Sequence, residues 1–117
     1  MVFSPKQPPL TEWVKVATVD ELSDGQMIDC IAGDIDICLA YIGGKYYAIN
    51  NICSHFFTWL SGGEIFPETL DVQCPLHDSR FSFETGEPTG PPADQPVEIY
   101  GVRIEGNDIL VGPKNGS

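Results

Sequence analysis

The sequence predicts an all-β protein, an antiparallel sandwich or barrel with a small subdomain inserted from about Asn51 to Pro92. Short segments that alternate apolar and polar residues recur along the chain, and turn residues separate them, as in strands. The sequence contains no long amphipathic helical pattern and no internal repeat. The 117 residues are enough for one domain, 1–117, with one modest core.

The first half of the chain predicts strands in close succession. An N-terminal arm, residues 1–11, is rich in proline and is expected to be flexible. The elements expected after it are a strand over Trp13–Ala17, a helical turn at Asp20–Leu22, and strands over Gln26–Ala32, Asp34–Ile42 and Lys45–Asn50. In the strand over 34–42 one face carries Ile35, Ile37, Leu39 and Tyr41. Gly43-Gly44 is a two-residue hairpin signal.

The second half predicts shorter strands separated by turns. The strands expected are Leu70–Cys74, Phe81–Phe83, Val97–Glu105 and Asp108–Val111. The last two form a hairpin across Gly106-Asn107. Residues 66–69 are expected to be a connector and residues 90–93 a stiff proline segment. The tail over 112–117 is expected to be flexible.

The charge of the chain limits its possible partners. The formal net charge is −11, which argues against nucleic acid, because phosphates require basic patches. It fits a soluble protein that meets positively charged partners, although solubility alone would also explain it. No secretory signal precedes the domain, and no apolar run approaches the ~20 residues needed to cross a bilayer. We therefore expect a cytoplasmic protein that does not contact a membrane.

Two short motifs place cysteine beside histidine. They are Cys53-Ser54-His55 and Cys74-Pro75-Leu76-His77, and they contain both histidines of the chain and two of its four cysteines. Thiolate and imidazole are ligands for iron and zinc. Zinc fingers usually pair like residues within each motif, whereas one Cys and one His per motif suit a Rieske 2Fe–2S cluster. Iron–sulfur is favoured and zinc remains the alternative.

The remaining cysteines and the rest of the chain suggest no catalytic site. Cys30 and Cys38 lie on predicted strands, and we interpret them as small, partly buried thiols rather than ligands or a disulfide. If both histidines bind metal, the chain has no histidine left to act as a general base or to activate a nucleophile. The sequence therefore predicts an electron carrier that is not itself an enzyme.

The residues around the two motifs resemble the Rieske-type ferredoxins of bacterial aromatic-ring-hydroxylating dioxygenase systems, from about Trp13 to about Val111. The resemblance rests on Cys53-Ser54-His55, Leu60-Ser61-Gly62-Gly63, Val72-Gln73-Cys74-Pro75-Leu76-His77, Phe81, Thr85-Gly86 and Pro91-Pro92-Ala93. It implies the Rieske fold, with the inserted subdomain binding the cluster and residues 90–93 covering it as a third loop. It implies that Cys53 and Cys74 ligate one iron and His55 and His77 the other.

The same resemblance implies a function and partners. The chain would pass single electrons from a flavin- and NAD(P)H-dependent reductase to a terminal ring-hydroxylating oxygenase, and we expect it to be monomeric. Two alternatives stay open, a Rieske small subunit of another redox enzyme such as nitrite reductase, and a structural zinc-binding module. The aromatic residues after His55 (Phe56, Phe57 and Trp59) and Pro91-Pro92 are expected to form an apolar docking face around the cluster.

Several positions differ from the pattern of related proteins. Asp78 follows the second histidine where glycine is common, and Arg80 would neutralise Asp78 or another carboxylate, or contact a partner. High-potential Rieske proteins of respiratory complexes carry a loop-tying disulfide where this chain has Thr58 and Leu76. They also carry a tyrosine where this chain has Phe81, while Ser79 matches their serine. We therefore expect a potential near the low end of the Rieske range, roughly −150 mV.

Overall fold

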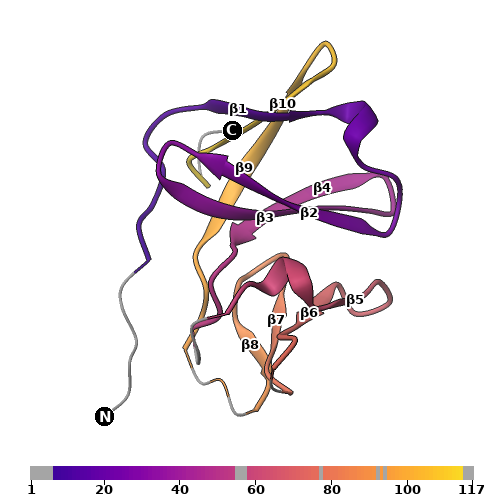
Figure 1. Cartoon of the computed structure of the whole chain (residues 1–117), viewed down its shortest axis with the longest axis vertical. Helices are drawn as coiled ribbons and strands as arrows, with labels where there is room; N and C mark the ends of the chain where they lie inside the picture. Colours follow the sequence, from indigo (N-terminus) through magenta and orange to yellow (C-terminus); the bar gives the residue numbers. More distant parts are fainter. Residues whose placement is uncertain (1–6, 55–57, 77, 92, 94, 115–117) are drawn as a thin grey trace.

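A computed structural model describes residues 7–54, 58–76, 78–91, 93 and 95–114 (Figure 1). The elements are almost all strands, as the sequence predicts. They are β1 (Val14–Thr18), η1 (Val19–Glu21), β2 (Gln26–Ala32), β3 (Ile35–Ile42), β4 (Lys45–Asn50), η2 (Leu60–Gly62), β5 (Glu64–Phe66), β6 (Asp71–Gln73), β7 (Arg80–Ser82), β8 (Pro88–Gly90), β9 (Ile99–Glu105) and β10 (Asp108–Gly112). Within the described residues, no helix has the length and apolar character that crossing a bilayer requires.

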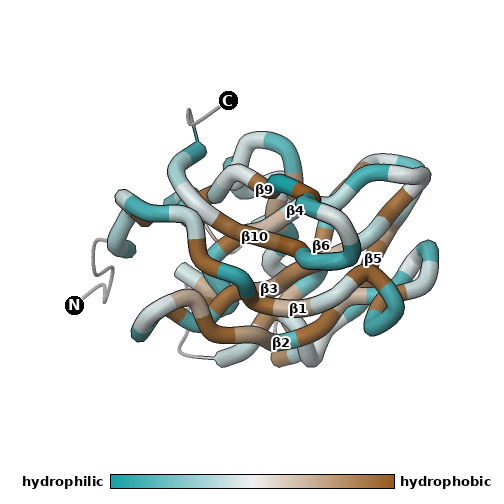
Figure 2. Tube along the Cα trace, turned by 90° about the horizontal axis from the view of Figure 1, so that it is seen from above, coloured by the Kyte–Doolittle hydropathy of each residue, from teal (hydrophilic) through white to brown (hydrophobic). Residues whose placement is uncertain are grey.

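Six strands form an antiparallel sheet in the order β1-β10-β9-β4-β3-β2, in the upper part of Figure 1. The two edge strands, β1 and β2, contact each other, so the sheet nearly closes into a barrel. Gly43 and Gly44 join β3 to β4 with φ of 61° and 86°, a left-handed turn that only glycine adopts without strain. Apolar residues lie along strands such as β10 and β2, and hydrophilic residues occupy the turns (Figure 2).

The second sheet is a meander in the order β5-β6-β7-β8, and it lies below the barrel in Figure 1. The sequence predicts β6 and β7 to within one residue at each end, but it predicts no strand at β5 or β8. The connector predicted over 66–69 overlaps the end of β5, and the stiff segment predicted over 90–93 overlaps the end of β8. Each strand of this sheet has only three residues, which is too short for the alternation of apolar and polar residues to show.

Strand β3 separates two apolar cores. On one face Ile35, Ile37 and Leu39 pack inside the barrel with β4, β9 and β10 residues. This is the face that the alternation predicts. On the other face Cys38, Ala40 and Ile42 pack against the second sheet. Because both faces are buried, β3 carries almost no polar residues, and the second sheet is held directly on the wall of the barrel.

From Gln7 onward the N-terminal arm forms hydrogen bonds with this body, while the flexibility expected for residues 1–11 stays a prediction. The Gln7 side chain bonds the backbone at Ile52 and at Glu98, and the Pro8 carbonyl accepts a hydrogen bond from Tyr100. The sequence does not predict these contacts, because side-chain hydrogen bonds to distant backbone leave no pattern in the sequence.

Candidate metal centre

The first cysteine motif lies in a hairpin loop, residues 53–58, which we call the first cysteine loop. A single antiparallel bridge, Ile52 with Trp59, closes it. The Cys53 N–H donates to the Thr58 carbonyl across the loop at 3.0 Å. Of the residues predicted to matter here, His55, Phe56 and Phe57 lie outside the described residues.

The second cysteine motif lies in a loop of the same length, residues 74–79, the second cysteine loop. Gln73 in β6 pairs with Arg80 in β7 and closes it. The Cys74 N–H donates to the Ser79 carbonyl at 2.8 Å, which repeats the bond of the first loop. Each cysteine is thus the first residue of a hairpin loop and is held by the same cross-loop bond. His77 lies outside the described residues.

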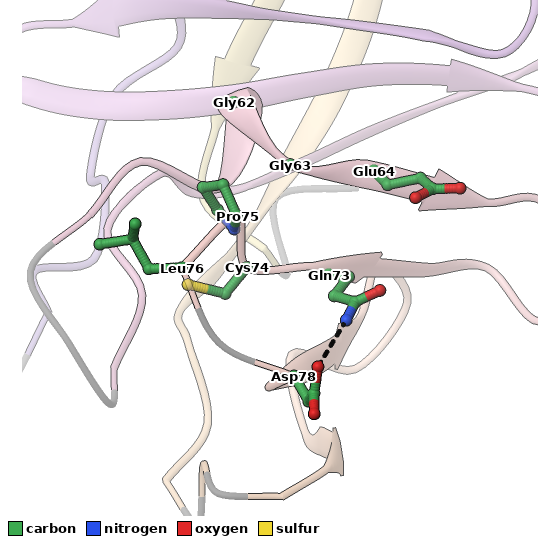
Figure 3. A pocket seen from close by; sticks show the side chains of 8 residues that line it. All are labelled: Gly62, Gly63, Glu64, Gln73, Cys74, Pro75, Leu76 and Asp78. Atoms are coloured by element: carbon green, nitrogen blue, oxygen red, sulfur yellow. Dashed lines mark hydrogen bonds between the residues drawn. The ribbon is translucent and has the colours of Figure 1, made fainter.

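Close backbone contact brings the two loops together. After the first loop the chain passes through η2 to Gly63, which lies against Gln73, the residue before Cys74. A Cβ at Gly63 would stand 1.8 Å from the Gln73 carbonyl oxygen, so only glycine fits. A hollow of about 450 Å³ opens beside this contact, between residues 62–64 on one side and residues 73–76 and 78 on the other (Figure 3).

Serine hydroxyls of both loops bond the proline segment predicted over residues 90–93 or the chain just after it. Ser54 in the first loop donates its hydroxyl to the Gln95 carbonyl at 2.5 Å. Ser79 in the second loop accepts the Ala93 N–H at 3.1 Å. Ala93, in the predicted segment, therefore lies against the second loop, and Gln95, two residues after it, lies against the first. Pro92, which was also predicted to belong to this segment, lies outside the described residues.

The thiols of the two motifs are buried in one apolar cluster. Cys53 is 3 % exposed and Cys74 2 %. Both pack with the core between the second sheet and the barrel, which also contains Leu60, Val72, Phe81 and Ala93. Metals bind cysteine as the thiolate, so a metal bound here would supply the positive charge that stabilises two thiolates in these buried positions.

The other two cysteines are thiols on the barrel wall, as the sequence predicts. Cys38 is fully buried and its sulfur lies 3.7 Å from that of Met27. Burial raises the pKa of Cys38, and it raises the pKa of Cys30 to about 12. These thiols therefore remain protonated at neutral pH and are poor nucleophiles.

Charged side chains form contacts at the ends of the two strands that close the second loop. Arg80 forms an ion pair with the buried Asp71 at 3.3 Å, and its guanidinium lies 3.8 Å from the centre of the Phe66 ring. Of the roles that the sequence leaves open for Arg80, neutralising a nearby carboxylate is thus the one observed. Asp78 instead accepts a hydrogen bond from the Gln73 side chain at 3.3 Å, drawn as a dashed line in Figure 3.

A polar network at the base of the first loop was not predicted. Asp36 in β3 accepts hydrogen bonds from the Asn51 amide at 3.1 Å and the Trp59 indole at 3.0 Å. Asn51 in turn accepts the Ser61 N–H at 2.7 Å. The one available signal was Asn50-Asn51 directly before the loop, since asparagine side chains often bond nearby backbone.

Apolar side chains are exposed on both loops. Trp59, at the end of the first, is 53 % exposed, and Leu76, in the second, is 60 % exposed. Ile31 on β2 is 55 % exposed. It is the register partner of Asp36 on β3, and Asp36 accepts the hydrogen bond from the Trp59 indole. Large apolar side chains at the loops are consistent with the predicted docking face.

The donor set fits the iron–sulfur cluster that the sequence suggests. Two buried thiols open matched loops that lie side by side, and each motif adds a histidine two or three residues after its cysteine. Paired Cys and His from two loops would place soft donors on one iron and nitrogen donors on the other. The backbone N–H groups of both cysteines donate to carbonyls of their own loops. They therefore stabilise the loops and do not contact the cluster.

Comparison with known proteins gives one family. Residues 12–101 match the Rieske [2Fe-2S] domain. The anthranilate 1,2-dioxygenase ferredoxin subunit of Burkholderia cepacia is 32% identical over 87% of this chain and 93% of its own length. The ferredoxin of carbazole 1,9a-dioxygenase from Nocardioides aromaticivorans IC177 is 38% identical, covers 89% of this chain and 100% of its own, and superposes with a TM-score of 0.84. A chain from a complex of reduced oxygenase and oxidized ferredoxin in carbazole 1,9a-dioxygenase superposes with a TM-score of 0.78 at 24% identity, and covers 86% of this chain and 92% of its own length. At that identity it shares the fold.

Proposed function

Because this chain belongs to the Rieske [2Fe-2S] domain family, we propose that it is a ferredoxin that carries single electrons to a terminal aromatic-ring-hydroxylating oxygenase. A flavin- and NAD(P)H-dependent reductase would supply the electrons. The similarity to named ferredoxin components over nearly their whole length supports this assignment.

The observation that carries the proposal is the matched pair of cysteine loops. Cys53 and Cys74 would hold one iron of the 2Fe–2S cluster, and His55 and His77 the other. The cluster, once bound, would exchange one electron and offer no coordination position to a substrate. The surrounding core would exclude water from the two sulfur ligands, since Leu60, Val72 and Phe81 are fully buried.

The protein's own residues would set how firmly the cluster is held and how it meets partners. The Ser54 and Ser79 hydroxyls would hold the proline segment and the chain just after it over the loops. Trp59 and Leu76 would make apolar contact with the partner at the edge of the cluster, where a short distance favours electron transfer. A cytoplasmic, monomeric carrier with a single domain and a cluster-binding part over 51–92 fits this role.

The charge of the chain should guide the approach of its partners. With a formal net charge of −11, the protein would be drawn to a basic surface on its redox partner. We expect second-order electron transfer to slow several-fold as salt rises through the physiological range, where the Debye length is about 8 Å. Stopped-flow measurement across salt concentrations checks this, and a rate that does not depend on salt would contradict steering.

The purified protein gives the first test of the function. A Rieske ferredoxin is brown and binds iron and acid-labile sulfide, whereas a zinc module is colourless and binds zinc. Electron transfer is then measured with purified reductase and oxygenase components of a ring-hydroxylating dioxygenase system, with product formation as the readout. A chain that binds zinc, or that carries a cluster but accepts no electrons from any flavoprotein reductase, would contradict the proposal.

A further inference from the structure

Ile52, the residue before Cys53, has a backbone N–H and a carbonyl that form no hydrogen bond across the hairpin. In the first cysteine loop, the bonds that flank the bridge run from Leu60 N–H to the Asn51 carbonyl, at 2.7 Å, and from Cys53 N–H to the Thr58 carbonyl, at 3.0 Å. In such a ladder the residue between the two bonds directs its own N–H and carbonyl away from its partner strand. The position of Cys53 therefore depends on what meets Ile52 from outside.

The carboxamide of Gln7 meets Ile52 there. Its Nε2 donates to the Ile52 carbonyl at 2.8 Å, and its Oε1 accepts the Glu98 N–H at 2.7 Å. The last rung of the sheet just before this point runs from Asn50 N–H to the Glu98 carbonyl, at 2.8 Å. A primary carboxamide presents one donor and one acceptor as a peptide group does, so Gln7 continues the ladder where β4 and β9 separate.

A ring of hydrogen bonds fixes Gln7 in return. The Ile52 N–H donates to Asn50 Oδ1 at 3.0 Å, Asn50 Nδ2 donates to the Tyr100 hydroxyl at 3.1 Å, and that hydroxyl donates to the Pro8 carbonyl at 2.8 Å. Pro8 adjoins Gln7, which closes the ring. Burial raises the pKa of Tyr100 to about 12, so its hydroxyl keeps the donated proton at neutral pH.

We propose that Gln7 is a positioning residue that holds the first cysteine loop, and Cys53 within it, through the backbone of Ile52. Gln7 lies before the region that matches the family, residues 12–101, so this clamp is a device of this chain's N-terminal segment. The second loop has its closing pair inside a sheet, between β6 and β7, and needs no such clamp. The inference that the clamp tunes a redox centre rests on the proposed function.

The isosteric substitution Gln7→Glu tests the clamp on the full chain. At pH 8 the carboxylate would place an acceptor against the Ile52 carbonyl and lose the donated bond. We expect amide protection of Cys53 and Leu60, measured by hydrogen exchange, to fall about tenfold relative to the unchanged protein. At about pH 5.5 the carboxyl group introduced at position 7 can be protonated and donate again, so the difference should shrink. Tyr100→Phe, which opens the ring without adding charge, should loosen the same amides.

Gln26→Glu is the matched control. Gln26 also accepts a backbone N–H through Oε1, from Ser23 at 2.8 Å, but at an exposed turn of the barrel. The Gln26→Glu substitution adds the same charge as Gln7→Glu and should leave the first loop unchanged. In the protein with its cluster, Gln7→Glu should also shift the midpoint potential at pH 8 and Gln26→Glu should not.

The results separate the clamp from a general structural role and from the proposed function. Equal protection of Cys53 and Leu60 in the Gln7→Glu and Gln26→Glu proteins at pH 8 would overturn the clamp. Protection lost uniformly over β3 and β10 as well would overturn it too, because that is global destabilisation. Hydrogen exchange needs no cluster, so a colourless protein would count against the proposed function while the exchange result still decides the clamp.

Discussion

The two cysteine loops have the same frame but different support. Each opens with a cysteine whose N–H bonds the last carbonyl of the loop. The first loop, however, is closed by one isolated bridge and is braced by side-chain amides of Asn51 and Gln7. The second is closed within a sheet, above the fully buried Val72 and Phe81.

This difference indicates which kind of interaction holds each half of the centre. Apolar packing is insensitive to pH and resists local opening, whereas a single hydrogen bond contributes only about 1 kcal/mol. The first loop should therefore open more readily than the second in hydrogen exchange. Substitutions that remove one support at a time can test this asymmetry.

The largest effect should come from the predicted ligands, and it should be equal in the two loops. Cys53→Ser and Cys74→Ser should each abolish the Rieske absorption and bound iron, because each removes a thiolate ligand. His55→Ala and His77→Ala should abolish or convert the spectrum. Cys30→Ser is the control, since that thiol lies on β2, and it should keep the cluster. An unchanged spectrum in any of the four ligand variants would contradict the assignment.

The next largest effect should fall on the support of the second loop. Asp71→Asn removes the charge that pairs with Arg80. We expect a loss of about 2 kcal/mol in the free energy of unfolding, measured in urea, because Asp71 is buried and Arg80 would lose its ion-pair partner. Asp108→Asn is the control. Its pair with Lys15 is about half exposed on both sides, so the loss should stay below about 0.5 kcal/mol. Equal losses would contradict the account.

A smaller effect should distinguish the two serines. The Ser54 hydroxyl already donates to Gln95, whereas Ser79 accepts from Ala93, so we predict that its own proton would bond a sulfur of the cluster. Ser79→Ala should lower the midpoint potential by roughly 40 mV, the equivalent of about 1 kcal/mol for one electron. Ser54→Ala should change it much less. Both are measured by spectroelectrochemical titration, and equal shifts would show that Ser79 does not reach the cluster.

The smallest effect should appear at the base of the first loop. A hydrogen bond to Asp36 raises the pKa of Asp29 to about 6, so the folded state favours the proton. Stability should therefore decrease as pH rises from about 4 through 6. Asp29→Asn should remove this decrease and stabilise the protein by a few tenths of a kcal/mol at pH 7, because Asp29 is exposed. Asp34→Asn, in the neighbouring turn, is the control. A thermal melt series over pH 4–8 checks both, and an unchanged pH dependence in Asp29→Asn would contradict the coupling.

The sequence predicts the barrel well, because its strands are long enough to show their period. Residues 35, 37 and 39 alternate as a barrel strand should, and glycine pairs such as Gly43-Gly44 mark the hairpins. The strands β5 and β8 are too short for such a pattern. The second buried face of β3 was also missed, because Cys38 and Ala40 are small and their burial depends on the second sheet.

Residue types were enough to locate the cysteine loops in the sequence. They did not predict how the loops are built. Cys and His at short spacing indicate a metal centre wherever the loops lie. The equal hairpin frames, the contact of Gly63 with Gln73 and the clamp of Gln7 depend on partners that are distant in the chain. Such contacts arise from the tertiary fold, and no local pattern encodes them.

The most direct test of the metal centre uses the two histidines. The chain has only His55 and His77, so protein labelled with ¹⁵N-histidine contains the nitrogen label at those two residues alone. Electron–nuclear double resonance of the reduced protein should detect two coupled ¹⁵N nuclei, one from each loop, and His55→Ala or His77→Ala should remove this pair of couplings. A reduced cluster without histidine coupling, or with one coupled nitrogen, would contradict the claim that the matched loops hold a Rieske cluster.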